Sequence, residues 1–188
     1  MKIHWAAGSR AILFMLFLTV SLSNSSFPQQ ESPPPSLADL RAKNFKIKTL
    51  HGKRIELNAL LDQGKPVILD IWASWCGPCR EEVPHLVEFA KSHSKDGLIV
   101  IGLTIEDPDD DLKAVKSFVK EFAMNYEVGF APPEIYLFFN GTSSVLRIPQ
   151  TMIFHPNGRM IRRLIGYNEK TGKRILDHAV SLALQPVN

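Results

Sequence analysis

The chain's only two cysteines lie close together in the stretch WASWCGPCR, where Gly77 and Pro78 separate Cys76 from Cys79. A disulfide across so short a ring is a weak structural staple, worth about 2 kcal/mol on the chain-entropy model against about 3 kcal/mol for a fifteen-residue loop. A structural zinc site needs about four ligands, and the sequence offers neither a second cysteine pair nor an H-x-x-x-H spacing to complete one. The pair therefore predicts redox chemistry at the thiols themselves, with no metal and no cofactor.

The motif also constrains the backbone on either side. The apolar run Val67–Trp72 predicts a strand buried on both faces, and residues 77–94 predict a helix. If Cys76 is the helix N-cap, Pro78 falls in the first turn, where its missing N–H costs little, and the N–H of Cys79 points toward the Cys76 sulfur. This arrangement stabilises a thiolate, and the pKa of such cysteines falls from about 8.5 to between ~3.5 and ~7.5. We expect Cys76 to be the exposed nucleophile and Cys79 to be the thiol that resolves the mixed disulfide.

The rest of the chain alternates strand and helix patterns. We expect a hairpin over 45–50 and 54–57, a strand over 98–104, helices over 58–61, 111–123, 132–139 and 169–184, and a second hairpin over 150–155 and 159–165. The turn residues Pro156, Asn157 and Gly158 favour this second hairpin. The sequence thus predicts an α/β fold with a mixed central β-sheet flanked by helices.

Two segments precede the expected domain, which spans 37–188. Residues 1–23 combine a basic start, small residues at 21 and 23, and an apolar run about half as long as the ~20 residues that span a bilayer. They predict either a cleaved signal peptide or an N-terminal membrane anchor. Residues 24–36 are polar and rich in proline and serine, which favours a linker that is mobile and not needed for the chemistry. The predicted signal peptide or anchor over 1–23 implies a location outside the cytoplasm, where disulfides persist.

The charge balance argues against nucleic acid as a partner. The 188 residues carry a formal net charge of +3, which falls to +1 once Lys2 and Arg10 of the first segment are left out. No strong basic field remains to attract a phosphate backbone.

Two stretches resemble a known family. Residues 69–80 resemble the active-site segment of the thioredoxins almost position for position, and Ile148-Pro149-Gln150-Thr151 resembles the strand in which that family holds a cis-proline. The N-terminal segment and the helix inserted after Leu103 make the chain most similar to the TlpA/ResA-type disulfide reductases. The resemblance implies a thioredoxin-like fold with an N-terminal β-hairpin, an inserted helix and a cis bond between Ile148 and Pro149.

The same resemblance suggests two candidates for a proton relay. In thioredoxins the acid that matches Asp70 is buried and serves the inner cysteine. An isolated buried carboxylate has a raised pKa, which suits a base that deprotonates Cys79. The alternative is that Asp70 pairs with a buried lysine, for which Lys65 is the nearest in sequence. Many TlpA-type proteins have Asn at this position and an acid near the end of the next strand, which here would be Glu106.

The substrate site implied by the resemblance surrounds the nucleophile. Trp75, Gly77 and Pro78 would form an apolar surface beside the sulfur. The free backbone groups of Ile148, next to Pro149, would bind an extended substrate strand.

The function implied is that of an extracytoplasmic thiol-disulfide oxidoreductase that reduces disulfides in exported proteins, with apocytochrome c among the candidate substrates. It would draw electrons from a membrane-bound or soluble thiol-disulfide donor. The Gly-Pro dipeptide resembles that of reducing thioredoxins, and an oxidase or isomerase of the same fold is the alternative. A copper-delivery protein of the Sco type would need a C-x-x-x-C pair and a histidine, and a peroxiredoxin would carry its cysteine in a different motif.

Overall fold

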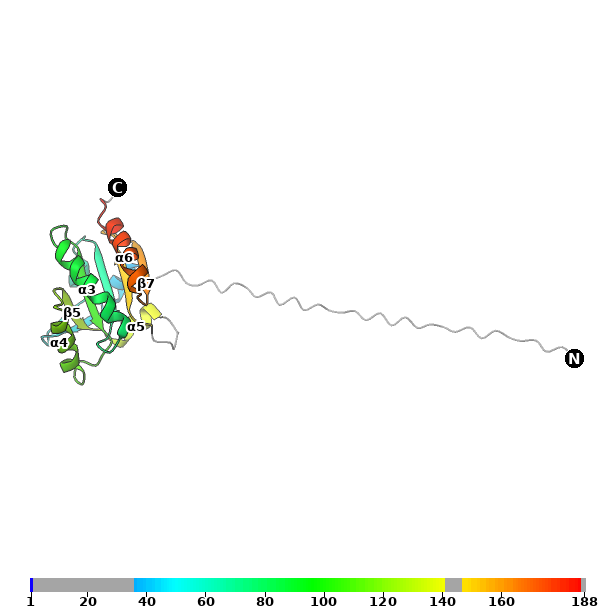
Figure 1. Cartoon of the computed structure of the whole chain (residues 1–188), viewed down its shortest axis with the longest axis horizontal. Coiled ribbons are helices and arrows are strands. Elements are labelled where there is room, and N and C mark those ends of the chain that lie inside the picture. Colours follow the sequence, from blue (N-terminus) through cyan, green and yellow to red (C-terminus); the bar gives the residue numbers. More distant parts are fainter. Residues whose placement is uncertain (2–35, 141–146, 187–188) are drawn as a thin grey trace. The chain divides into compact units, whose positions relative to one another are not determined.

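The strand predicted to precede the motif is the centre of the molecule. All six residues of β3 (Val67–Trp72) are buried in the computed structural model, which describes Met1 and residues 36–140 and 147–186 (Figure 1). The predicted signal or anchor over 1–23 and the linker over 24–36 therefore lie outside the described residues, apart from Met1 and Ser36. Every helix of residues 36–140 and 147–186 is too short or too polar to span a lipid bilayer.

Within the described residues, seven strands form one mixed sheet in the order β2-β1-β5-β4-β3-β6-β7. The strands besides β3 are β1 (Lys46–Thr49), β2 (Arg54–Glu56), β4 (Ile99–Thr104), β5 (Glu127–Phe130), β6 (Gln150–Phe154) and β7 (Met160–Ile165). β3 pairs in parallel with β4, which pairs in parallel with β5, while the other neighbours are antiparallel. This confirms the predicted mixed sheet and both predicted hairpins.

Helices cover both faces of the sheet. They are α1 (Leu37–Lys43), α2 (Asn58–Leu61), α3 (Gly77–Ser92), α4 (Leu112–Glu121), α5 (Pro133–Asn140) and α6 (Glu169–Ala183). Apolar side chains of α1, α2 and α5 pack against Val67, Leu69 and Ile71 of β3. The opposite face receives α3 and α6 around Ile68, and α4 around Trp72. Figure 1 shows α3 and α6 side by side.

This alternation decides where the acid in β3 lies. Successive side chains of a strand point to opposite faces, so Asp70 shares the α3 face with Ile68 and Trp72. Its register partners are Gly102 of β4 and Thr151 of β6. Asp70 is therefore in the middle of the sheet, below the helix that carries both cysteines.

Two elements were not predicted. Helix α1 begins with a capping box between Ser36 and Asp39 and has only two buried residues, Leu37 and Leu40, which is too little apolar periodicity to detect in sequence. Strand β5 has four residues and includes Gly129, where a Cβ would come within 3.2 Å of the Lys48 carbonyl oxygen. Glycine weakens a strand pattern, and β5 depends on its pairing with both β1 and β4.

A first prediction concerns the start of the fold. Removing residues 1–35 leaves the Ser36 cap in place, so we expect the thermal midpoint to stay within about 2 °C of that of the full chain. Ser36→Ala, which removes the cap, should lower the free energy of unfolding by about 1 kcal/mol. Circular dichroism melts measure both, and loss of a cooperative transition in the shortened chain would show that the preceding residues are part of the fold.

Candidate active site

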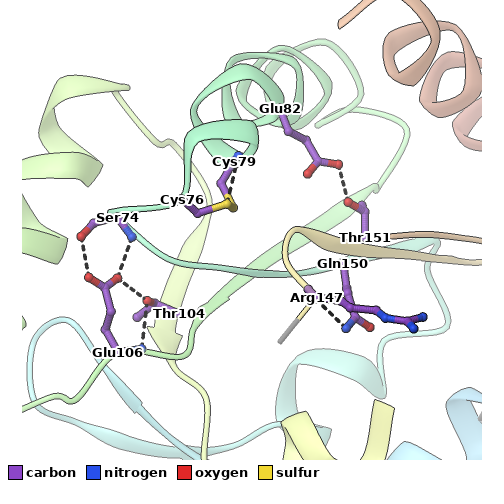
Figure 2. Close-up of a disulfide and its surroundings, with 9 residues drawn as sticks. All are labelled: Ser74, Cys76, Cys79, Glu82, Thr104, Glu106, Arg147, Gln150 and Thr151. Atoms are coloured by element: carbon purple, nitrogen blue, oxygen red, sulfur yellow. Dashed lines mark hydrogen bonds between the residues drawn. A yellow bond between two sulfur atoms is a disulfide. The ribbon is translucent and has the colours of Figure 1, made fainter. Parts of the chain in front are cut away.

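The two cysteines are bonded to each other at the start of α3 (Figure 2). Cys76 is the N-cap, with extended backbone angles, and its sulfur accepts a hydrogen bond from the N–H of Cys79 at 3.2 Å. Pro78 lies in the first turn, where its missing N–H leaves no partner unsatisfied. The predicted cap geometry is therefore confirmed, and it places a helix N-terminus and a backbone donor at the sulfur that would carry negative charge.

The accessibility of the cysteines differs from the prediction in degree. Cys79 is fully buried, and Cys76 is itself only 4% exposed, not the exposed residue that was expected. It packs in an apolar cluster that also includes Cys79 and Trp72, with Ile148 against it. The neighbouring surface is open: Trp75 is 61% exposed, and Gly77 and Pro78 are exposed beside it. This exposed stretch of the motif therefore flanks the Cys76 sulfur on both sides in the sequence.

Asp70 is completely buried, and neither of its carboxylate oxygens has a hydrogen-bond partner among the described residues. Burial raises the pKa of Asp70 well above its ordinary value, and the charge of Glu82 raises it further. The alternative of a pair with Lys65 is wrong, because the Lys65 ammonium bonds to the exposed Gln63 and its stem lies against Gly97. Burial therefore favours the protonated, neutral form of the Asp70 carboxyl group over the charged form.

Glu82, which the sequence analysis missed, is a second buried acid that interacts with Asp70. It lies one turn after Cys79 on α3, and Figure 2 shows its carboxylate next to Thr151 of β6, whose hydroxyl donates a hydrogen bond to it. Burial raises its pKa to about 7, partly offset by the Thr151 bond. A signal was present in the sequence: Cys79, Glu82 and Leu86 recur at helical spacing, which puts an acid on the buried face of α3.

Two hydrogen-bond donors share this buried region. The Trp72 indole N–H and the Tyr126 hydroxyl have no partner among the described residues, and the same holds for the Oε2 atom of Glu82. A Cβ on Gly102, the register partner of Asp70, would come within 3.0 Å of both the Trp72 and the Tyr126 rings. Burial raises the pKa of Tyr126, and the charges of Asp70 and Glu82 raise it further. The two donors therefore lie in the same buried region as the carboxyl groups of Asp70 and Glu82. A second ionised carboxylate in this region would cost free energy.

Glu106, the other predicted relay, makes a different set of contacts. Its carboxylate accepts hydrogen bonds from the Ser74 N–H at 2.7 Å, from the Ser74 hydroxyl, and from the Thr104 hydroxyl at 2.6 Å. Both oxygens are therefore occupied, and Figure 2 shows them turned toward the loop that leads to Cys76. In this position Glu106 fixes the approach of the chain to the N-cap.

The segment before β6 adjoins the disulfide. The Ile148–Pro149 bond is cis, as the family resemblance implied. Ile148 packs against the apolar cluster of the two cysteines, and its N–H and C=O have no hydrogen-bond partner among the described residues. The Pro149 carbonyl accepts a bond from the Gly166 N–H at 2.8 Å. The backbone of Ile148 and Pro149, which we call the ledge, therefore offers one donor and one acceptor without a partner among residues 36–140 and 147–186, beside the cluster of the two cysteines.

Comparison with known proteins identifies the family. The AhpC/TSA family matches residues 39–170. The thiol-disulfide oxidoreductase ResA of a Bacillus cereus strain is 33% identical over 129 residues, which is 69% of this chain and 70% of that protein. A thiol:disulfide interchange protein of the thioredoxin family from Chlorobium tepidum TLS superposes with a TM-score of 0.63 at 29% identity, over 82% of this chain and 97% of that one.

A more distant structure shares the fold. A secreted Mycobacterium tuberculosis disulfide oxidoreductase, homologous to E. coli DsbE, superposes with a TM-score of 0.60 at 21% identity, over 74% of this chain and 96% of that one. The chain belongs to the AhpC/TSA family of thioredoxin-like proteins and, with its Cys76–Cys79 disulfide at the N-terminus of α3, to the thiol-disulfide oxidoreductases among them.

Proposed function

We propose that this protein reduces disulfides in exported proteins, outside the cytoplasm, through a dithiol–disulfide cycle of Cys76 and Cys79. The observation that carries the proposal is the cap hydrogen bond from the Cys79 N–H to the Cys76 sulfur, because it stabilises the thiolate on the cysteine nearer the surface. The location is supported by the signal-like start of the sequence.

Each cycle transfers two electrons from the two thiols of the enzyme to the disulfide of the substrate. The Cys76 thiolate attacks one sulfur of the substrate disulfide, a Cys76–substrate bond forms, and the other substrate sulfur leaves as a thiolate. Cys79 then gives up its proton and attacks the Cys76 sulfur, so that the Cys76–Cys79 disulfide forms and the second substrate thiol is released. The two substrate thiolates take up protons. A dithiol donor, membrane-bound or soluble, restores the reduced enzyme by the same exchange in reverse.

We assign the proton acceptor for Cys79 to the buried acid pair Asp70 and Glu82. Glu82 lies one helical turn from Cys79, and a base with a pKa of about 7 accepts and returns a proton efficiently near neutral pH. The charge of Glu82 raises the cost of ionising Asp70, so the pair disfavours carrying two negative charges at once. Glu106 is left with a positioning role through Ser74.

Trapping tests the function. In a Cys79→Ser variant the mixed disulfide on Cys76 is not resolved, so exported proteins with disulfides, apocytochrome c among them, should accumulate as covalent partners; Cys76→Ser is the matched control and should trap none. A reduction potential near the value of about −270 mV found for thioredoxin is expected for a reductase. A potential near about −120 mV would favour the alternative, an oxidase.

The thiols should react unequally with alkylating reagents. In the reduced protein at pH 7 we expect iodoacetamide to modify Cys76 at least about tenfold faster than Cys79, because the cap stabilises the Cys76 thiolate while Cys79 is fully buried. Mass mapping of partly labelled protein measures this ratio. Modification of Cys79 first would reverse the assigned roles.

The acid pair should make the oxidised protein less stable as the pH rises. Glu82 binds its proton more tightly in the folded state, with a pKa of about 7 against an ordinary 4.5. The unfolded state therefore holds fewer protons between these values, and stability falls from pH 5 to pH 8 by about 3 kcal/mol or less for this group. Glu82→Gln and Asp70→Asn should each reduce the fall, and the double variant should remove most of it.

Urea unfolding with the disulfide intact measures this fall without contributions from free thiols. Glu81→Gln, on the exposed side of the same helical turn, is the control and should keep the wild-type pH profile. If the double variant lost as much stability as the wild type between pH 5 and pH 8, the two acids would not be the groups that titrate.

A further inference from the structure

A half-buried arginine lies behind the ledge. Arg163 is in β7, opposite Met152 of β6 in the register, on the sheet face covered by α1 and α5. Its Nη2 atom donates hydrogen bonds to the Phe139 carbonyl, in the last turn of α5, and to the side-chain oxygen of Gln150 at 2.7 Å. One guanidinium thus joins the end of a helix to the first residue of β6.

Gln150 extends this connection to the residue that precedes the ledge. Its side chain is fully buried and its amide nitrogen donates to the Arg147 carbonyl at 2.7 Å, a bond visible in Figure 2. The Arg147 N–H in turn donates to the Tyr136 hydroxyl at 3.2 Å. The backbone of Arg147 is therefore held at both its N–H and its C=O by side chains. Ile148 and Pro149 lie between two fixed residues, Arg147 and Gln150.

Placing a cation here has a cost. Burial lowers the pKa of Arg163, and the charge of Arg147 lowers it further. The carbonyl end of the α5 dipole offsets part of this cost. The neighbouring Arg162 points to the opposite face of the sheet, where its side chain is exposed, and makes no such contacts with the described residues. Both hydrogen bonds of the Arg163 guanidinium come from its Nη2 atom, and the bond to Gln150 continues through the Gln150 amide to the Arg147 carbonyl that precedes the ledge.

We propose that Arg163, acting through Gln150, is a positioning residue that holds the ledge at Ile148 and Pro149 in register for an extended polypeptide substrate. This rests on the proposed function, because it assumes that substrates bind at the ledge. It adds that recognition of the polypeptide is separable from the reactivity of the Cys76 sulfur. A protein disulfide needs both the ledge and the sulfur, whereas a small disulfide needs only the sulfur.

Two substrates separate these contributions. We expect Arg163→Met to raise the KM for insulin, a protein disulfide, about tenfold, which corresponds to loss of a charge-assisted hydrogen bond. The second-order rate constant with the small aromatic disulfide DTNB and the reduction potential should stay within about twofold of wild type, since neither depends on the ledge. Arg163→Lys should recover part of the loss. Arg162→Met, on the same strand, is the matched control and should behave as wild type with both substrates.

The outcomes distinguish the proposals. An unchanged KM for insulin in Arg163→Met overturns the positioning role, and so does an equal loss with insulin and DTNB, which would indicate a general disturbance of the site. If Arg163→Met does not fold, Arg163→Lys and Gln150→Leu give the same test, each weakening the link to Arg147. Failure of the wild-type protein to reduce either disulfide would instead refute the proposed function and leave the geometry of the ledge untouched.

Discussion

Burial of β3 on both faces is the constraint on which the rest of the structure depends. Its parallel pairing with β4 and antiparallel pairing with β6 fix the ends of three strands close together. Cys76 follows the end of β3, Glu106 follows β4, and the ledge precedes β6. The thiols, the carboxylate that holds their loop and the ledge therefore come from distant parts of the sequence, yet their relative positions follow from one strand register.

The same burial makes the acids of the site unusual. Asp70 occupies a position in a fully buried strand where an apolar side chain would be expected. Glu82 occupies the same kind of position on the buried face of α3. Apolar residues at these positions would make a more stable core, because a buried carboxyl without full hydrogen bonding costs free energy. Burial raises the pKa of both acids, and the pKa of about 7 for Glu82 makes its proton uptake near neutral pH favourable.

The sequence predicted those features that depend on local chemistry. The C-x-x-C spacing, with proline in the first turn, was enough to predict the N-cap geometry, and the turn at Gly158 predicted the second hairpin. The cis bond at Pro149 came from the family resemblance alone. Strand β5 was missed because its formation depends on neighbours on both sides, and α1 because a short helix relies on its cap and on packing.

The site was harder to predict wherever tertiary contacts decide it. Glu82 carried a helical-spacing signal, but its partner Thr151 is far away in the sequence, and only the fold brings them together. The contact of Ile148 with the cluster of Cys76 likewise joins segments that are distant in the sequence. No local pattern specifies the contacts of Arg163, because Phe139 and Gln150 become its neighbours only when α5 and β6 are in place.

The attachment of Ser74 to Glu106 has a consequence for how a partner distinguishes the two redox states of the enzyme. With the approach to Cys76 tied to β4 through both the N–H and the hydroxyl of Ser74, the backbone has little freedom to rearrange when the sulfur–sulfur bond opens. The bonds of Ser74 to Glu106 therefore resist rearrangement of this loop. On the proposed cycle the reduced enzyme presents a negative sulfur at the head of α3 and the oxidised enzyme a neutral one. The charge at this one atom then distinguishes the form of the enzyme that meets the substrate from the form that meets the electron donor.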